Sequence, residues 1–139
     1  MILKDNGISR VELRKGLIYK TQPKHLTDNE IWCLEKLAYS GYVPLARQIS
    51  IDTIEMEFIK ETSITDLEAI IAHFVNILSA LQDAGIRHGD LTEANILIKD
   101  NHPYVIDFSE SRLHCDPRPD KRPEGDKYWL KRTLKQYGT

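Results

Sequence analysis

Cysteine is scarce in this sequence. The chain has two, Cys33 and Cys115, which stand far apart and show neither the paired spacing of a zinc site nor the density of a disulfide framework. We therefore expect two free thiols, as is usual in a reducing compartment. This scarcity argues against a small secreted scaffold and predicts a cytoplasmic protein.

Long apolar runs and a strong net charge are also missing. The first ten residues, MILKDNGISR, lack the apolar core of a signal peptide, and no run approaches the roughly 20 apolar residues that cross a membrane. The formal net charge is −2, so no overall basic field favours nucleic acid. We expect no membrane partner.

One local exception is a basic segment near the C-terminus. Its charges could contact nucleic acid or a partner protein, although such residues more often form a solvated helix face. Its members are Lys121, Arg122, Lys127, Lys131, Arg132 and Lys135.

Several catalytic patterns are absent too. The chain contains no nucleophile-elbow serine and no catalytic Cys–His arrangement. His88, His102 and His114 do not have the spacing of metal ligands. The remaining candidates for functional side chains are carboxylates, amides and lysines.

The residues that are present predict one α+β domain over 1–139. Of the 139 residues, 41% are hydrophobic and 29% are charged, which is an ordinary globular mixture. Alternating and helical periodicities set the expected elements. These are hairpins at 11–20 and 49–58, helices at 28–40, 65–84 and 126–137, short strands at 95–98 and 104–108, and a loop at 112–124.

Two of the expected helices begin with a capping-box pattern. Thr27 is followed three residues later by Glu30, and Thr65 by Glu68, which is the spacing of reciprocal N-terminal hydrogen bonds. The second helix should end at Gly85. In this interpretation Glu30 serves only the end of its own helix.

The stretch IRHGDLTEANILIKDNHPYVIDF, residues 86–108, holds the most informative polar residues. Asp90 precedes a short strand that begins at Asn95, and Asp107 ends the strand that returns beside it. A hairpin would bring Asn95 and Asp107 together, and their oxygens suit a magnesium ion that carries phosphate. Asp90 could then accept the proton of a substrate hydroxyl. Alternatively, each acid could be only a turn residue.

These motifs resemble those of protein-kinase-like enzymes. HGDLTEAN, residues 88–95, is similar to the catalytic loop, and IDFS, residues 106–109, to the metal-binding DFG segment. The Gly in second place and the Thr after Leu91 most resemble RIO kinases and the small kinase of the KEOPS complex. The resemblance implies a two-lobed fold with a small antiparallel N-lobe sheet and one helix (1–59) and a reduced helical C-lobe (60–139).

The same resemblance assigns roles to further residues. Lys20 matches the strand lysine that contacts the nucleotide phosphates, and Glu30 the helix glutamate that pairs with it, with Glu35 as the competitor. The loop around Gly7 and Ser9 is similar to a degenerate phosphate-covering loop. Backbone groups of Glu57 and Ile59 match the hinge that binds adenine, and Asp126 matches the acid that braces the catalytic loop.

The chain also departs from the typical kinase pattern. It has one glycine in the phosphate loop, Gly89 in place of a regulatory Arg, and Thr92 in place of a phosphate-binding Lys. Ser109 replaces the glycine of DFG, which would penalise a positive φ there. The chain ends without a further helical lobe, so the resemblance is to a truncated, near-minimal member.

The resemblance implies an ATP- and Mg²⁺-dependent phosphotransferase, with a hydroxyl-bearing substrate that we expect to be protein. Lys20, Asp90 and Asn95 would be catalytic, and Asn95 and Asp107 would hold the metal. The favoured activity is Ser/Thr protein phosphorylation. The alternatives are a nucleotide-binding pseudokinase, an ATPase scaffold that depends on a partner, and a small-molecule kinase.

Overall fold

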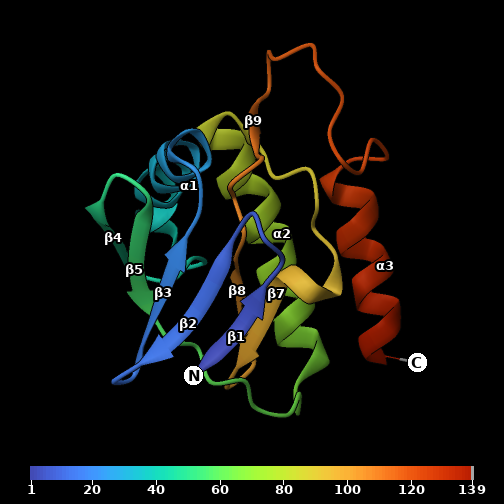
Figure 1. Ribbon diagram of the computed structural model, residues 1–139. Coiled ribbons are helices and arrows are strands. Elements are labelled where there is room, and N and C mark those ends of the chain that lie inside the picture. The colour runs from blue at the N-terminus through green and yellow to red at the C-terminus, as the bar shows by residue number, and fades with distance from the viewer. Residues whose placement is uncertain (139) are drawn as a thin grey trace.

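The computed structural model of the protein describes residues 1–138, one residue short of the end of the predicted domain. A five-stranded antiparallel sheet packs against one helix, and beyond it lie two more helices and two small two-stranded sheets (Figure 1). The predicted α+β, two-lobed kinase-like architecture is confirmed. The division of the lobes between residues 59 and 60 stays a prediction.

The large sheet contains both predicted hairpins and one strand that the sequence pattern does not reveal. Its order is β1-β2-β3-β5-β4, with β1 (Ile2–Asp5), β2 (Arg10–Arg14), β3 (Leu17–Thr21), β4 (Ala46–Ser50) and β5 (Thr53–Glu57). All four residues of β1 are exposed, so it shows no alternation of apolar and polar side chains. Lys20 stands on the central strand, where it pairs with Val11 on one side and Ile54 on the other.

Helix α1 (Lys24–Leu37) starts one turn earlier than predicted. Thr27 is not its cap: it lies inside the first turn, fully buried, and its Oγ1 donates to the carbonyl of Gln22 over 3.1 Å. The capping-box prediction for Thr27 and Glu30 is therefore wrong. Pro23 occupies the N-cap position, with φ of −52° and ψ of 150°, and it makes no side-chain capping hydrogen bond.

Helix α2 (Leu67–Ala84) ends at Gly85 as predicted, with φ of 71°. Its cap is Asp66 rather than Thr65, because the Asp66 carboxylate accepts from the N–H of Ala69 over 3.1 Å. Thr65 is instead held by Asn101, whose amide donates to the Thr65 hydroxyl over 2.8 Å and accepts from its N–H. The prediction of a capping box between Thr65 and Glu68 is also wrong.

The hairpin in the second half of the chain is tighter than predicted. Strands β7 (Ile96–Lys99) and β8 (His102–Val105) are joined by Asp100 and Asn101 alone, both with positive φ. The strand predicted at 104–108 thus begins and ends earlier. Asn95 closes the 3₁₀ helix η2 (Glu93–Asn95) before β7, and Asp107 lies two residues beyond β8.

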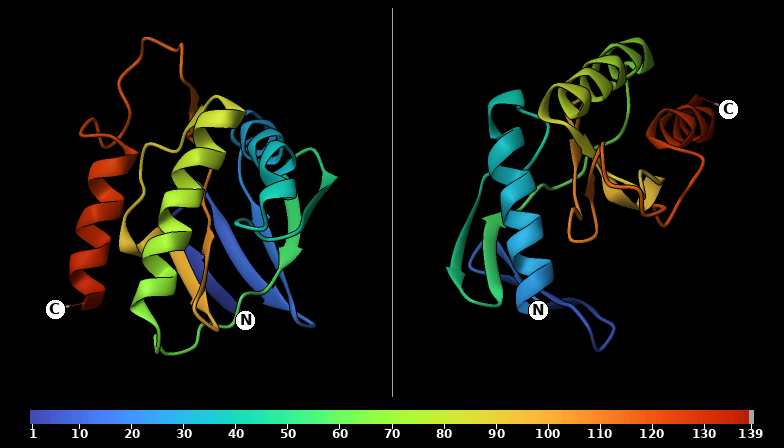
Figure 2. Two further views of the ribbon diagram at one scale, coloured as in Figure 1. Left: turned by 180° about the vertical axis from the view of Figure 1, so that it is seen from behind. Right: turned by 90° about the horizontal axis from the view of Figure 1, so that it is seen from above.

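The remaining elements frame that hairpin. The short strands β6 (Ile86–Arg87) and β9 (Arg112–Leu113) pair with each other, and α3 (Asp126–Gly138) follows a long loop after β9. Figure 2 shows α2 between α1, which lies against the large sheet, and α3 on the opposite side. Within the described residues, no helix has both the length and the apolar character to cross a membrane.

The main hydrophobic core joins the two halves of the molecule. It packs Leu34 and Leu37 of α1 against Ile70, Phe74 and Ile77 of α2. Phe108, which is fully buried, belongs to the same cluster. A smaller cluster of Ile31, Ile54 and Met56 holds α1 to the sheet. Burial on both sides of α1 therefore fixes that helix relative to the sheet and to the segment that carries Asp107.

Candidate active site

A buried ion pair between Lys20 and Glu30 forms the centre of the site. Lys20 Nζ lies 2.9 Å from Glu30 Oε1, and their side chains are only 10% and 1% exposed. Glu30 also accepts from Gln22 Nε2 over 2.8 Å and from the N–H of Phe108 over 3.1 Å. This carboxylate thus serves three elements rather than its helix end, whereas the competitor Glu35 points to solvent.

Asp107 lies on the other side of Lys20. Lys20 Nζ donates to Asp107 Oδ1 over 3.1 Å, and the hydroxyl of Ser109 donates to the same oxygen over 2.9 Å. Asp107 has φ of 64°, so the left-handed residue of this segment is Asp107 and not Ser109. The penalty expected for a positive φ at Ser109 therefore does not arise, and Ser109 donates a hydrogen bond to the Asp107 carboxylate.

Burial and neighbouring charges shift the pKa values of Lys20 and Asp107 in opposite directions. Burial alone would lower the pKa of Lys20, but Glu30 and Asp107 outweigh it, and the pKa lies above its usual value. Burial alone would raise the pKa of Asp107, but the Lys20 charge and its hydrogen bonds with Lys20 and Ser109 lower it to about 2. Both groups therefore stay ionised at neutral pH, so one cation faces two carboxylates.

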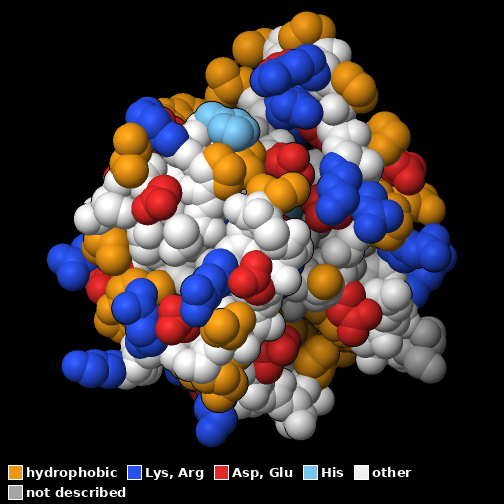
Figure 3. All heavy atoms as spheres, viewed as in Figure 1, with side chains coloured by type: hydrophobic (Ala, Val, Ile, Leu, Met, Phe, Trp, Pro, Cys, Tyr) orange, Lys and Arg blue, Asp and Glu red, His pale blue; other side chains and the backbone are white. Residues whose placement is uncertain are grey.

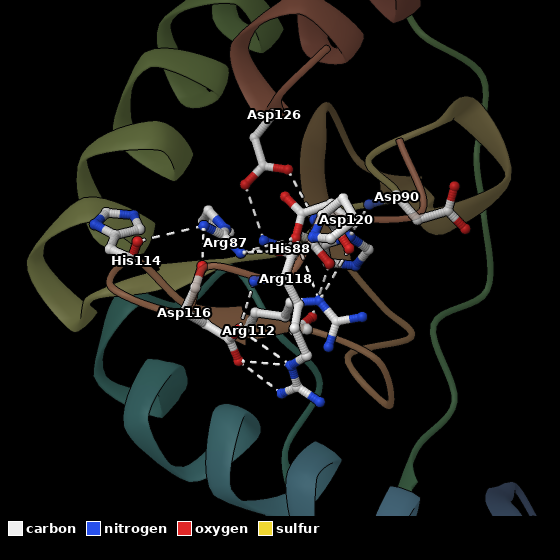
Figure 4. A network of polar contacts seen from close by, with 12 residues as sticks. Arg87, His88, Asp90, Arg112, His114, Asp116, Arg118, Asp120 and Asp126 are labelled. Carbon is white, nitrogen blue, oxygen red and sulfur yellow. Dashed lines mark hydrogen bonds and ion pairs between the residues drawn. The ribbon is translucent and has the colours of Figure 1, made fainter. Parts of the chain in front are cut away.

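The loop of residues 88–92 is braced from α3, as the resemblance predicts. The Asp126 carboxylate accepts from the N–H groups of His88 and Gly89, over 2.9 and 3.0 Å (Figure 4). His88 is buried, and its Nε2 donates to the carbonyl of Ile106 over 2.8 Å. His88 therefore ties the loop to the segment just before Asp107 and has a structural role.

Asn95 links this loop to the segment that carries Asp107. Its Nδ2 donates to the backbone carbonyl and to the carboxylate of Asp90, over 2.9 and 3.2 Å. The backbone carbonyl of Asn95 accepts from the N–H of Ile106 over 3.0 Å. The three predicted residues Asp90, Asn95 and Asp107 therefore belong to one connected region.

Two oxygens in this region suit a magnesium ion. Within residues 1–138, Asn95 Oδ1 and Asp107 Oδ2 accept no hydrogen bond. The other polar atom of each side chain does form hydrogen bonds, because Asn95 Nδ2 donates and Asp107 Oδ1 accepts. Hard oxygen donors beside an excess of negative charge are what magnesium prefers. The donor set present thus fits the expected metal.

A cavity of about 630 Å³ lies between the large sheet and the β7–β8 hairpin. Its polar lining includes Lys20, Glu30, Asn95 and Asp107. Its apolar walls come from both lobes, among them Val11, Ile18, Met56, Leu97 and Ile106. This combination of apolar walls and charged lining residues suits a ligand with an aromatic ring and an anionic group.

The predicted hinge residues line this cavity as well. The N–H of Glu57 is already used, since it donates to the carbonyl of Leu45, the residue before β4, over 2.9 Å. The N–H of Ile59 donates to no acceptor within residues 1–138, so it is available to a ligand.

Gly7 and Ser9 lie apart from this cavity. They line a separate surface hollow with Gln22, Lys24 and Asp52. Their N–H groups are already used, because Asp5 accepts from Gly7 and Asn6 accepts from Ser9, over 3.1 and 2.8 Å. The structure therefore does not bring these two predicted residues to the cluster around Lys20.

Sequence reasoning missed the residues that hold the segment after Asp107. Asn29 Nδ2 lies within 3.2 Å of three carbonyls, those of Phe108, Ser109 and Ser111. Asn29 is adjacent to Glu30 in α1, so the same helix turn positions the ion pair and this segment. No sequence pattern identifies a polar helix residue that hydrogen-bonds to the backbone of a segment distant in sequence.

Two basic residues of the β9–α3 loop were interpreted as part of a solvated face but contact Asp90. Arg122 Nε donates to Asp90 Oδ1 over 2.9 Å, and Lys121 Nζ lies 3.5 Å from Asp90 Oδ2. Lys and Arg side chains gather over this loop and α3 (Figure 3). Their place beside Asp90 depends on the path of a long loop that no periodic pattern describes.

The chain is similar to known proteins in family and in fold. The family model of the RIO domain matches residues 10–125. A search of curated proteins found no match. Among 206 matching chains of solved structures is WbdD, from a co-crystal structure with the kinase inhibitor LY294002, at 17% identity and a TM-score of 0.62. The match covers 81% of this chain but 33% of that chain, so this chain spans about a third of WbdD. At this identity the likeness shows the fold alone.

Proposed function

The chain belongs to the RIO domain family of atypical protein-kinase-like, ATP-binding phosphotransferases, and on this premise we propose that it transfers the γ-phosphoryl group of ATP to a serine or threonine hydroxyl of a protein. The observation that carries the proposal is the contact of the buried Lys20 side chain with both Glu30 and Asp107, all of which line the large cavity. Phosphoryl transfer needs positioning and charge neutralisation more than covalent chemistry by the protein.

Each residue has a defined task in this proposal. Lys20, held by Glu30, orients the nucleotide phosphates. Asn95 Oδ1 and Asp107 Oδ2 hold magnesium, which when bound neutralises phosphate charge. The apolar walls take the adenine ring, whose edge can hydrogen-bond to the backbone N–H of Ile59, which is free within residues 1–138.

Asp90 aligns the acceptor hydroxyl. As the bond between the γ-phosphorus and the ADP oxygen breaks, the hydroxyl oxygen forms the new bond to phosphorus, and its proton passes to the Asp90 carboxylate. Asn95 donates from Nδ2 to that carboxylate, so one hydrogen bond connects the proposed base with a proposed metal ligand.

We expect labelled γ-phosphate to pass from ATP to the protein itself or to a generic protein substrate. Asp90→Ala and Asp107→Ala should each lower this transfer by about a hundredfold or more, because they remove the base and a metal ligand. Asp83→Ala is the matched control, since it removes an exposed carboxylate from α2. Equal transfer by wild type, Asp90→Ala and Asp107→Ala would refute the assignment.

A nucleotide-binding pseudokinase is the second candidate, and two groups of contacts favour it. The Asp90 carboxylate is already occupied by Lys121 and Arg122, and the N–H groups of Gly7 and Ser9 are used within their own loop. This candidate predicts MgATP binding without transfer to protein or to small alcohols. Transfer only to added amino-alcohols or sugars would instead identify a small-molecule kinase.

A further inference from the structure

The proposed phosphotransferase site is short of positive charge. Among residues 1–138, Lys20 is the one cation that pairs with Glu30 and Asp107, and Thr92 stands where typical kinases have a phosphate-binding lysine. In the transition state, the anionic phosphoryl group that passes between two oxygens is stabilised by nearby cations. The site therefore needs a second cation on the side of Asp90.

The β9–α3 loop supplies cations at this place. Lys121 lines a small cavity of about 30 Å³ together with Asp90, Asp107 and Ser109. Its ammonium group thus faces the space between the proposed base and the proposed metal ligand. Lys121 and Arg122 together place two cations beside the Asp90 carboxylate.

The backbone of Lys121 is fixed by its neighbour on each side. The Asp120 side chain is 9% exposed and forms ion pairs with Arg87 Nη2, at 3.3 Å, and Arg112 Nε, at 3.8 Å (Figure 4). Arg122 donates its N–H to the carbonyl of Gly89 over 2.9 Å. A side chain at Gly89 would meet Asp120 at 3.1 Å, so the glycine in HGD allows this close approach.

Arg122 and Lys121 have different surroundings, which separates their roles. The Arg122 guanidinium stacks 4.9 Å from the Trp129 ring centre while its Nε holds Asp90 Oδ1. This places Arg122 as a positioning residue for the Asp90 carboxylate. Lys121 makes only a 3.5 Å contact with Asp90, and its side chain is 61% exposed, so an incoming phosphate can easily displace that contact.

We infer that Lys121 replaces the missing catalytic-loop lysine and contacts the transferred phosphoryl group from the β9–α3 loop. This inference rests on the proposed function, because it requires ATP in the large cavity. The opposing interpretation is that Lys121 and Arg122 form a cap that blocks Asp90, and it predicts the opposite effect of mutation.

The experiment compares Lys121→Ala, Lys121→Arg and Lys127→Ala, which removes an exposed lysine six residues along the chain. We expect Lys121→Ala to lower kcat about 10- to 100-fold with KM for ATP changed by less than about threefold, because the contact forms in the transition state. Lys121→Arg should restore part of kcat, and Lys127→Ala should behave as wild type.

A binding measurement tests the same contact without turnover. Wild type should bind MgADP more tightly when aluminium fluoride is added, because the planar fluoride mimics the phosphoryl group in transfer. In Lys121→Ala, the increase in MgADP affinity caused by aluminium fluoride should be at least about tenfold smaller than in wild type. The affinity of this variant for MgADP alone should be unchanged.

The outcomes separate this inference from the function on which it rests. If wild type binds no nucleotide, the proposed function and the inference both fail. If wild type transfers phosphate or gains affinity with fluoride, and Lys121→Ala does the same to the same extent, only the inference fails. A rise in kcat in Lys121→Ala would show that the loop is a cap and would also overturn the inference.

Discussion

Asp107 is a single carboxylate whose charge state links stability to pH. Its pKa in the folded protein is about 2, below the ordinary 3.8, although its partial burial opposes ionisation. The unfolded chain therefore binds this proton more readily than the folded chain does. The stabilisation is present above about pH 4 and is lost as the pH falls from about 4 to about 2, and it amounts to about 2 kcal/mol.

We expect Asp107→Asn to flatten the dependence of unfolding free energy on pH between about 4 and 2. Denaturant unfolding at a series of pH values would measure this slope, and Asp83→Asn on α2 would serve as the control. The comparison concerns slopes, because the variant also removes a partner of Lys20 and lowers stability at neutral pH. An unchanged slope in Asp107→Asn would contradict the ionised, paired state.

Motif spacing predicted the residues that share the site and missed those that support it. Asp90, Asn95 and Asp107 could be found because one short stretch contains all three. Gln22 and Asn29 could not, since each acts through contacts with residues distant in sequence. Gly7 and Ser9 were assigned by resemblance alone, and the side chains of Asp5 and Asn6 already satisfy the turn that contains them.

At the scale of elements, the two helix starts show how local patterns mislead. Thr27 and Thr65 each have a glutamate three residues later, yet neither is a cap. Glu30 is drawn into the buried cluster with Lys20, and Thr65 pairs with Asn101 of the β7–β8 turn. Tertiary partners therefore override the capping signal, whereas Gly85 ends α2 as predicted because its positive φ is a local requirement.

This difference leads to a stability prediction for α2. Asp66→Ala should lower the unfolding free energy by about 1 kcal/mol, because the N–H of Ala69 loses its acceptor. Glu68→Ala should cost only a few tenths of a kcal/mol through the helix dipole, since Thr65 N–H is already held by Asn101. Chemical denaturation of both variants would measure this, and a larger loss in Glu68→Ala would favour the capping box instead.

At the scale of the whole molecule, the order of elements was predictable because several weak signals agreed. Alternation, helical periodicity and kinase-like motifs all placed a sheet with one helix before a long helix and a hairpin. The β9–α3 loop was the part that resisted prediction. Its course depends on Arg87, which donates to the carbonyls of Asp116 and Arg118, and on the ion pairs of Asp120. Such contacts have no periodicity that a sequence could display.

The large cavity has walls from both halves of the molecule, so a nucleotide bound there would hold the halves together. Lys20 and Glu57 come from the sheet, and Asn95, Leu97 and Asp107 from the second half. MgATP at about 100 times its Kd should add about 2.7 kcal/mol to the unfolding free energy. For a chain of 139 residues that is a rise in Tm of roughly 10 °C.

The rise should depend on magnesium and on Asp107. Chelation of the metal should remove most of the rise in wild type, and Asp107→Ala should show little rise at any nucleotide concentration, because one of the two proposed metal ligands is lost. Asp83→Ala should keep the full increment, and each variant is compared with its own ligand-free Tm, because Asp107→Ala also removes the contact with Lys20. An Asp107→Ala increment equal to that of wild type would mean that the nucleotide, if it binds, does not bind through this carboxylate.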